Sequence, residues 1–189
     1  MRAMQRLSTD DLLLEPLVAG HAEAMFPLLT ESALYRWIDE APPADVDRLR
    51  ARYAHLETRT SGDGRQHWLN WVVRRSGQPP LGYLQATVLE DGSAWVAYLL
   101  GSAHQGQGIA TRATAAMLAH LEAAYGATRL LANVEAQNAP SIRLLQRLGF
   151  RAADAEEAAR HGPTASERIF VRDRRERSGD AARPPVPAS

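Results

Sequence analysis

A glycine-rich turn has the residue types and the position of a phosphate-binding site. It follows the apolar run 95–100, precedes a helical pattern over residues 109–125, and consists of Gln105, Gly106, Gln107, Gly108, Ile109 and Ala110. The first N–H groups of a helix have no intrahelical acceptor, and the helix dipole adds partial positive charge. Glycine also lets a ligand approach the backbone closely, because it has no Cβ. We therefore expect this turn to hold a pyrophosphate.

The turn alone leaves several interpretations open. A Walker loop needs a lysine, and all 22 basic residues of the chain are arginine. A Rossmann fingerprint would have a third small residue at Thr111 and would open a βαβ unit, whereas three strands with short turns come first here. The remaining alternative is a plain turn between a strand and a helix.

A second block, 133–150, follows the turn at a distance that makes the pair informative. It contains Asn138, Ser141, Gly149 and Phe150 in the pattern N-x-x-S-x-x-h-h-x-x-x-G-F, where h is apolar. Together the two blocks resemble the GNAT family of acetyl-CoA-dependent N-acetyltransferases, and the turn matches the family's acyl-CoA motif. The resemblance covers about Leu12 to Val171.

Within that family, the chain is most similar to the RimJ/RimL-like ribosomal-protein N-acetyltransferases. The early segments 13–17 and 21–29 and the pair Ala97-Tyr98 carry this likeness. The chain departs from the branch in the loop 104–109, where many members have Trp-Gly-Lys/Arg-Gly-Tyr, and at Arg112, where many have Glu. These departures leave the acceptor open.

The resemblance implies a cofactor site. Acetyl-CoA would lie between two splayed strands, its pantetheine arm pairing with the backbone near Leu99 and Leu100. The N–H groups of residues 107–110, with Thr111 nearby, would hold the pyrophosphate. Asn138 would bond either the pantetheine arm or an N–H at its own helix start. Three arginines, each of which could equally be a solvated surface residue, are candidates for the ribose phosphate: Arg112, Arg143 and Arg147.

The same resemblance implies direct transfer of acetyl to an amine, and the absence of cysteine removes the usual nucleophile of a two-step route. Ser141 would lie near the thioester sulfur and protonate the leaving thiolate, or else serve only to start its helix. The base is left open among five side chains: His67, Glu90, Asp91, His104 and Glu135. Five aromatic residues could line the acceptor pocket or simply belong to the core: Tyr35, Trp37, Trp68, Trp71 and Tyr83.

Composition is that of one ordinary domain. The chain has 189 residues, is 45% hydrophobic and carries no formal net charge, which argues against a polyanion binder. It lacks a signal-peptide pattern and an apolar run long enough for a membrane span. We expect a cytoplasmic protein, monomeric or homodimeric, that uses acetyl-CoA as co-substrate and no metal. An amine is its expected partner, with neither nucleic acid nor membrane.

Hydrophobic periodicity and turn signals predict an α+β fold: a mostly antiparallel, splayed mixed sheet of six or seven strands with about four helices. Residues 1–172 would form one domain, with a loose leader before Asp10 and a disordered tail over 173–189. Pro27 should break the first helix. The function expected is transfer of acetyl to a primary amine, possibly a protein N-terminal α-amine. Alternatives are a small amine such as an amino acid, polyamine or aminoglycoside, or acyl-CoA binding without turnover.

Overall fold

The computed structural model describes residues 4–174, and within them a single mixed sheet organises the chain. Its eight strands lie in the order β1-β2-β3-β4-β5-β6-β8-β7. Their bounds are Leu7–Ser8 (β1), Leu13–Pro16 (β2), Gln66–Arg74 (β3), Pro80–Leu89 (β4), Ser93–Leu100 (β5), Arg129–Glu135 (β6), Arg151–Ala152 (β7) and Glu167–Asp173 (β8). All neighbouring pairs are antiparallel except β5 and β6. The predicted mixed, mostly antiparallel sheet is confirmed.

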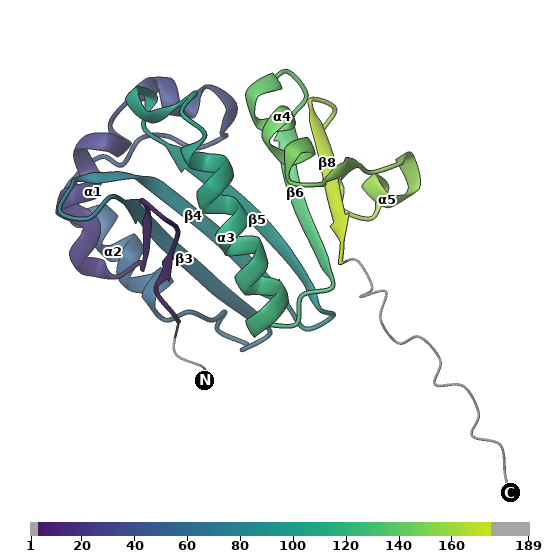
Figure 1. Ribbon diagram of the computed structural model, residues 1–189, viewed down its shortest axis with the longest axis horizontal. Helices are drawn as coiled ribbons and strands as arrows, with labels where there is room; N and C mark the ends of the chain where they lie inside the picture. The colour runs from purple at the N-terminus through teal and green to yellow at the C-terminus, as the bar shows by residue number, and fades with distance from the viewer. Residues whose placement is uncertain (1–3, 175–189) are drawn as a thin grey trace, which may run out of the picture.

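Strands β5 and β6 pair over only three residues. Ser93, Ala94 and Trp95 lie opposite Arg129, Leu130 and Leu131, and no pairing follows. Figure 1 shows the two strands meeting at one end and diverging toward the other. We call this divergence the split. It is the splayed geometry that the sequence led us to expect, and it leaves the second half of β5 without a strand on that side.

Five α-helices and three short 3-10 helices cover the sheet. The α-helices are Ala22–Leu29 (α1), Val46–Glu57 (α2), Ile109–Ala124 (α3), Ala139–Arg147 (α4) and Ala155–Ala159 (α5), and the 3-10 helices are Ala19–His21, Ser32–Trp37 and Ser102–His104. Helices α3 and α4 pack on one face, and α1 and α2 pack on the other. None of the helices in the described part of the chain is long and apolar enough to cross a membrane.

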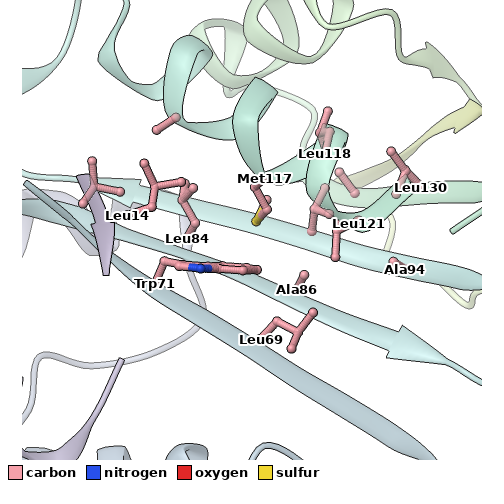
Figure 2. Close-up of a cluster of buried hydrophobic side chains, with 14 of the residues drawn as sticks. Leu14, Leu69, Trp71, Leu84, Ala86, Ala94, Met117, Leu118, Leu121 and Leu130 are labelled. Carbon is pink, nitrogen blue, oxygen red and sulfur yellow. The ribbon is translucent and has the colours of Figure 1, made fainter. Parts of the chain in front are cut away.

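The main core lies between α3 and the strands. Met117 and Leu121 of α3 are fully buried, and Figure 2 shows Met117 over the ring of Trp71. The α3 positions 109, 113, 117 and 121 recur at helical spacing and are all buried, so one stripe of the helix faces the sheet. This packing fixes the axis of α3 and therefore the direction in which its first turn points.

Three details differ from expectation. The leader is partly ordered, because Leu7–Ser8 pairs with β2. Pro27 does not break α1, which continues to Leu29. The carbonyl that the missing N–H would have bonded belongs to Glu23, an exposed residue, so the lost hydrogen bond lies on the solvent side of the helix. Finally, β8 runs to Asp173 and Arg174 bonds Thr128, so the first two residues of the predicted tail belong to the fold. Residues 175–189 lie outside the described range.

The carboxylate of Glu15 joins β2 to its surroundings. It accepts a hydrogen bond from Arg74 of β3 at 3.0 Å and lies 3.3 Å from Arg6 and 3.7 Å from His21. Its side chain is only 17% exposed. The hydrogen bond from Arg74 lowers the pKa of Glu15 below the ordinary value of 4.5, against the opposing effect of burial.

We expect Glu15→Gln to lower the free energy of unfolding by about 0.5–1 kcal/mol at pH 7, because Arg74 loses its charged acceptor. Since the native pKa is depressed, the contribution of Glu15 is present above about pH 4.5 and is lost as pH falls through the native pKa. Urea unfolding from pH 7 to pH 3 measures this. The control is Glu23→Gln, which removes an exposed carboxylate of α1. If wild type and Glu15→Gln differ in their free energy of unfolding by as much at pH 3 as at pH 7, the assignment is contradicted.

Candidate active site

The glycine-rich turn lies at the open end of the split, between β5 and α3. Strand β5 ends at Leu100, a 3-10 turn follows, and α3 begins at Ile109. Gly106 and Gly108 have φ values of 75° and 71°. This left-handed conformation is costly for residues with a Cβ, which is why the turn uses glycine at these two positions. Gln105 through Gly108 are exposed, so a ligand reaches their backbone from solvent.

Six consecutive backbone N–H groups of this turn are unpaired. No acceptor among the described residues is found for the N–H groups of residues 106–111, whereas the Arg112 N–H bonds the Gly108 carbonyl. Together with the dipole of the sixteen-residue helix α3, these donors form a site for an anion. The geometry therefore fits the pyrophosphate predicted for this turn, with backbone N–H groups as the available donors.

The turn's own side chains hold its shape. Gln105 donates from Nε2 to the Leu100 carbonyl at 3.2 Å, and Gln107 donates to the Ala103 carbonyl at 3.0 Å. Arg112 donates to the Gln107 carbonyl and also pairs with Asp11 at 3.0 Å. Arg112 is thus placed beside the turn and half exposed, while Arg143 and Arg147 lie on the exposed side of α4.

The backbone of β5 presents alternate peptide groups to the split. The Gly101 N–H donates to the carbonyl of Leu81, near the start of β4. From there the register places Leu100 opposite Gly82 and Leu99 opposite Tyr83. In an antiparallel pair the hydrogen-bonded positions alternate. The peptide groups of Leu99 therefore face β4, and those of Tyr98 and Leu100 face the split. This favours Leu100 over Leu99 as the backbone partner of a pantetheine arm and adds Tyr98 to the candidates.

Gly82 makes this close approach of β4 and β5 possible. A Cβ at Gly82 would lie 2.0 Å from the Leu99 carbonyl oxygen and 2.8 Å from the Leu100 Cα. Both are backbone atoms, so no side-chain movement relieves the overlap. The glycine therefore fixes the path of β5 where the strand borders the split.

Ser141 lies at the start of α4, on the opposite side of the split from β5. Its hydroxyl is 2.7 Å from the hydroxyl of Tyr98, and the Tyr98 hydroxyl is also 3.3 Å from the Ser141 carbonyl oxygen. Burial raises the pKa of Tyr98 to about 12, so the phenol is neutral at physiological pH and acts as a hydrogen-bond donor or acceptor. This bond connects β5 to α4 across the split.

Asn138 is the N-cap of α4. Its Oδ1 accepts a hydrogen bond from the Ser141 N–H at 3.2 Å, and Pro140 occupies the first turn. Of the two roles expected for Asn138, the structure shows the bond at the helix start. The same cap holds the backbone of Ser141, so the motif residues act on one another.

The predicted bases do not lie together. His67 pairs with Val88, which in turn pairs with Ala94, so His67 lies at the closed end of the sheet with Glu90 and Asp91 in the adjacent turn. Ala94 and Leu100 lie six positions apart on β5, about 20 Å along the strand, so these three residues are far from the glycine-rich turn. As candidates for the base they stay predictions. His104 lies in the turn beside the anion site, and Glu135 ends β6 at the open end of the split.

The five aromatic candidates for the acceptor pocket also separate. Trp71 is fully buried in the core, Trp68 stacks at an angle against His55, and Trp37 lies beneath Arg36. Tyr35 and Tyr83 line a cavity of about 280 Å³ beside α2. Sequence reasoning missed other residues of this cavity, among them Tyr53, Glu40 and Arg52, because they belong to a polar loop and an ordinary amphipathic helix. The sequence analysis used Tyr98 only as evidence for the family resemblance and did not predict its contact with Ser141.

Comparison with known proteins settles the family. Residues 11–151 match the model of the acetyltransferase (GNAT) domain. The chain belongs to this family. The match contains the glycine-rich turn, the split and the start of α4, so the sequence-based identification of the family is confirmed.

Two solved structures show how far the GNAT fold is shared. RimL, a ribosomal L7/L12 α-N-protein acetyltransferase in complex with coenzyme A, has a TM-score of 0.76 and is 18% identical, over 89% of this chain and 98% of its own. RimJ of Mycobacterium smegmatis, in complex with a CoA disulfide, has a TM-score of 0.71 and is 24% identical. This match covers 86% of the present chain and 81% of RimJ. The RimJ/RimL likeness predicted from the sequence is thus confirmed at the level of the fold.

A curated relative agrees with this. An uncharacterized N-acetyltransferase, p20 of Bacillus licheniformis, is 25% identical over 150 residues, which cover 78% of this chain and 83% of the relative.

We expect Gly108→Trp to abolish coenzyme A binding measured by calorimetry, because the side chain would cover the unpaired N–H groups. The matched control is Gly77→Trp. Gly77 has a similar φ of 68°, lies in the hairpin between β3 and β4, and has no atoms near its would-be Cβ. Both variants should therefore lose similar stability, roughly 1–2 kcal/mol, from the left-handed backbone. Equal affinity of the two variants for coenzyme A would show that the turn is not the anion site.

Proposed function

We propose that the protein transfers acetyl from acetyl-CoA directly to a primary amine. The observation that carries the proposal is the row of unpaired N–H groups over residues 106–111, placed at the mouth of the split. An anion site alone would suit many ligands. An anion site beside an unpaired strand edge suits a ligand with a pyrophosphate and an extended amide-containing arm, which is the chemistry of coenzyme A.

Different groups of the protein would bind different parts of acetyl-CoA. The N–H groups of the turn hold the pyrophosphate, with Thr111 in the same first turn of α3. The peptide groups of Tyr98 and Leu100 pair with the amides of the pantetheine arm, as an added strand would. Arg112, tied to Asp11 and the Gln107 carbonyl, supplies positive charge beside the turn without needing a lysine. Acetyl-CoA, when bound, supplies the activated acetyl group.

The reaction forms a bond between the amine nitrogen and the acetyl carbon and breaks the bond from that carbon to sulfur. The amine loses one proton, and the sulfur gains one. Ser141 would donate its hydroxyl hydrogen to the leaving sulfur and be reprotonated through water by the proton that the amine releases, which is our assignment of the acid. Tyr98 lies at hydrogen-bonding distance from Ser141 Oγ. If Tyr98 donates to that oxygen, the Ser141 hydrogen is free to point at the sulfur.

The proton from the amine requires a separate acceptor. Glu135 and His104 are the predicted bases that remain at the open end of the split. Glu135 accepts a hydrogen bond from Ser166 at 3.1 Å, which fixes the direction of its carboxylate. Both groups are accessible to water, so either can receive the proton directly or through a water molecule. The sequence contains no cysteine for a covalent acetyl intermediate.

A protein N-terminal α-amine is our first candidate acceptor. Its support is the likeness in fold to RimL and to RimJ, the first of which is a ribosomal L7/L12 α-N-protein acetyltransferase. A small amine is the second candidate, because the cavity beside α2 has the volume of a small ligand site.

Release of free thiol from acetyl-CoA, measured over panels of small amines and N-terminal peptides, tests the proposal. Amine-dependent release should occur at pH 7–8 and stop in Gly108→Trp. Binding of coenzyme A without thiol release on any panel would instead favour a binding protein on the same fold.

Ser141→Ala should lower kcat by roughly 10–100-fold and change the KM for acetyl-CoA little, because Ser141 acts on the leaving sulfur. Tyr98→Phe should lower kcat by a smaller factor in the same direction, since it removes only the bond that orients Ser141. Ser76→Ala, in the exposed hairpin before β4, is the control and should leave both constants unchanged. Wild-type kcat in Ser141→Ala would assign Ser141 a structural role.

A further inference from the structure

The cavity beside α2 lies on the sheet face opposite α3. Its volume is about 280 Å³, at the small end of the range for ligand pockets. Four leucines, one just after β2, one in α1 and two in α2, form apolar parts of its wall. Its polar lining includes Tyr35, Tyr53, Tyr83, Glu40, Arg52 and Gln85. A site of this size has room for a ring-sized group, since a cavity of about 150 Å³ already holds benzene.

One polar group in the cavity wall is unsatisfied. The Tyr53 hydroxyl is buried, with the residue only 4% exposed, and it has no hydrogen-bond partner among the described residues. The Tyr35 hydroxyl, by contrast, donates to the Leu29 carbonyl at 2.9 Å. A buried hydroxyl without a partner costs free energy, so a ligand that formed a hydrogen bond with Tyr53 would recover that cost.

The charges of the cavity argue against polycations. Glu40 is the one acidic residue of its lining, and Arg52 already pairs with both of its oxygens at 2.8 and 3.2 Å. Arg48 adds a second positive charge. Burial raises the pKa of Tyr83 to about 12 and also raises the pKa of Tyr53, so both phenols stay neutral. The cavity therefore offers no surplus of negative charge to a polyamine or an aminoglycoside.

The floor of the cavity lies one strand away from the split. Tyr83 and Gln85 of β4 line the floor and lie opposite Leu99 and Ala97 of β5. Ala97 is exposed and lies just beyond Trp95, where the β5–β6 pairing ends. A ligand body in the cavity would thus project one short group across a single strand, over Ala97, to the place where the acetyl group would be transferred.

We propose that this cavity takes the body of the acceptor, which is a monoamine with an uncharged, ring-sized group ending in a hydroxyl. The hydroxyl bonds Tyr53, and the amine extends over Ala97 toward the split. The inference rests on the proposed function, because it names the substrate class for that reaction. The same chemistry could belong to a free phenolic amine or to an N-terminal tyrosine of a peptide.

The test compares two amines that differ by one hydroxyl, 4-hydroxyphenethylamine and phenethylamine, in wild type and in Tyr53→Phe. Wild type should favour the hydroxylated amine in kcat/KM, and Tyr53→Phe should lower kcat/KM for that amine roughly 5–10-fold while leaving phenethylamine unchanged. The KM for acetyl-CoA should not move. Spermidine should be a poor acceptor in both proteins. Parallel assays of Tyr-Ala-Ala and Phe-Ala-Ala peptides distinguish a peptide source from a free amine.

A second variant tests the location independently of Tyr53. Ala44→Trp, at an exposed position of the cavity lining, should lower kcat/KM for every acceptor at least tenfold with coenzyme A binding intact. Ala51→Trp, on α2 but outside the lining, is its matched control and should behave as wild type.

Two outcomes separate this proposal from the proposed function. Amine-dependent thiol release that neither Tyr53→Phe nor Ala44→Trp alters would overturn the cavity assignment and leave acetyl transfer standing. If no amine supports thiol release, calorimetry with 4-hydroxyphenethylamine in the presence of coenzyme A decides. Binding that weakens in Tyr53→Phe then supports the cavity as a phenolic-amine site, and no binding overturns it.

Discussion

The short parallel ladder between β5 and β6 is the constraint on which the rest of the site depends. Its three residue pairs hold the two halves of the sheet together at one end, and the strands separate beyond Trp95 and Leu131. The second half of β5 therefore keeps peptide groups that no strand pairs. The turn after Leu100 then places the start of α3, with its unpaired N–H groups, at the same end. A continuous ladder would have removed the strand edge.

The two sheet faces make separate contributions. On one face, α3 packs through a stripe that includes Met117 and Leu121, and this fixes where its first turn points. On the other face, α1 and α2 leave a cavity whose floor is β4. The faces are coupled near the turn: the Ser102 N–H bonds the Glu31 carboxylate at 3.0 Å, and a Cβ at Gly101 would contact Leu28. The end of α1 thus supports the anion site.

The proposed site relies mostly on neutral groups. Backbone N–H groups would take the place of the lysine of other phosphate loops, and Tyr98 reaches Ser141 as a neutral phenol because burial raises its pKa to about 12. Such groups keep their hydrogen-bonding character over a wide pH range. A pH dependence of the reaction would therefore arise from the amine and its base.

Most of the elements, the glycine-rich turn, the helix start at Asn138 and the family could be predicted from the sequence, because these follow from local spacing, helix-start chemistry and glycine's backbone freedom. Which of two roles Asn138 takes stayed open, and the strand at Leu7–Ser8 and the continuity of α1 through Pro27 were missed. The tertiary structure decided which distant residues meet. Strand register placed His67, Glu90 and Asp91 at the closed end of the sheet and turned the peptide groups of Leu99 toward β4. Packing across the split brought Tyr98 to Ser141, 43 positions along the chain. Register and helix packing depend on the whole buried surface, so no local pattern specifies them.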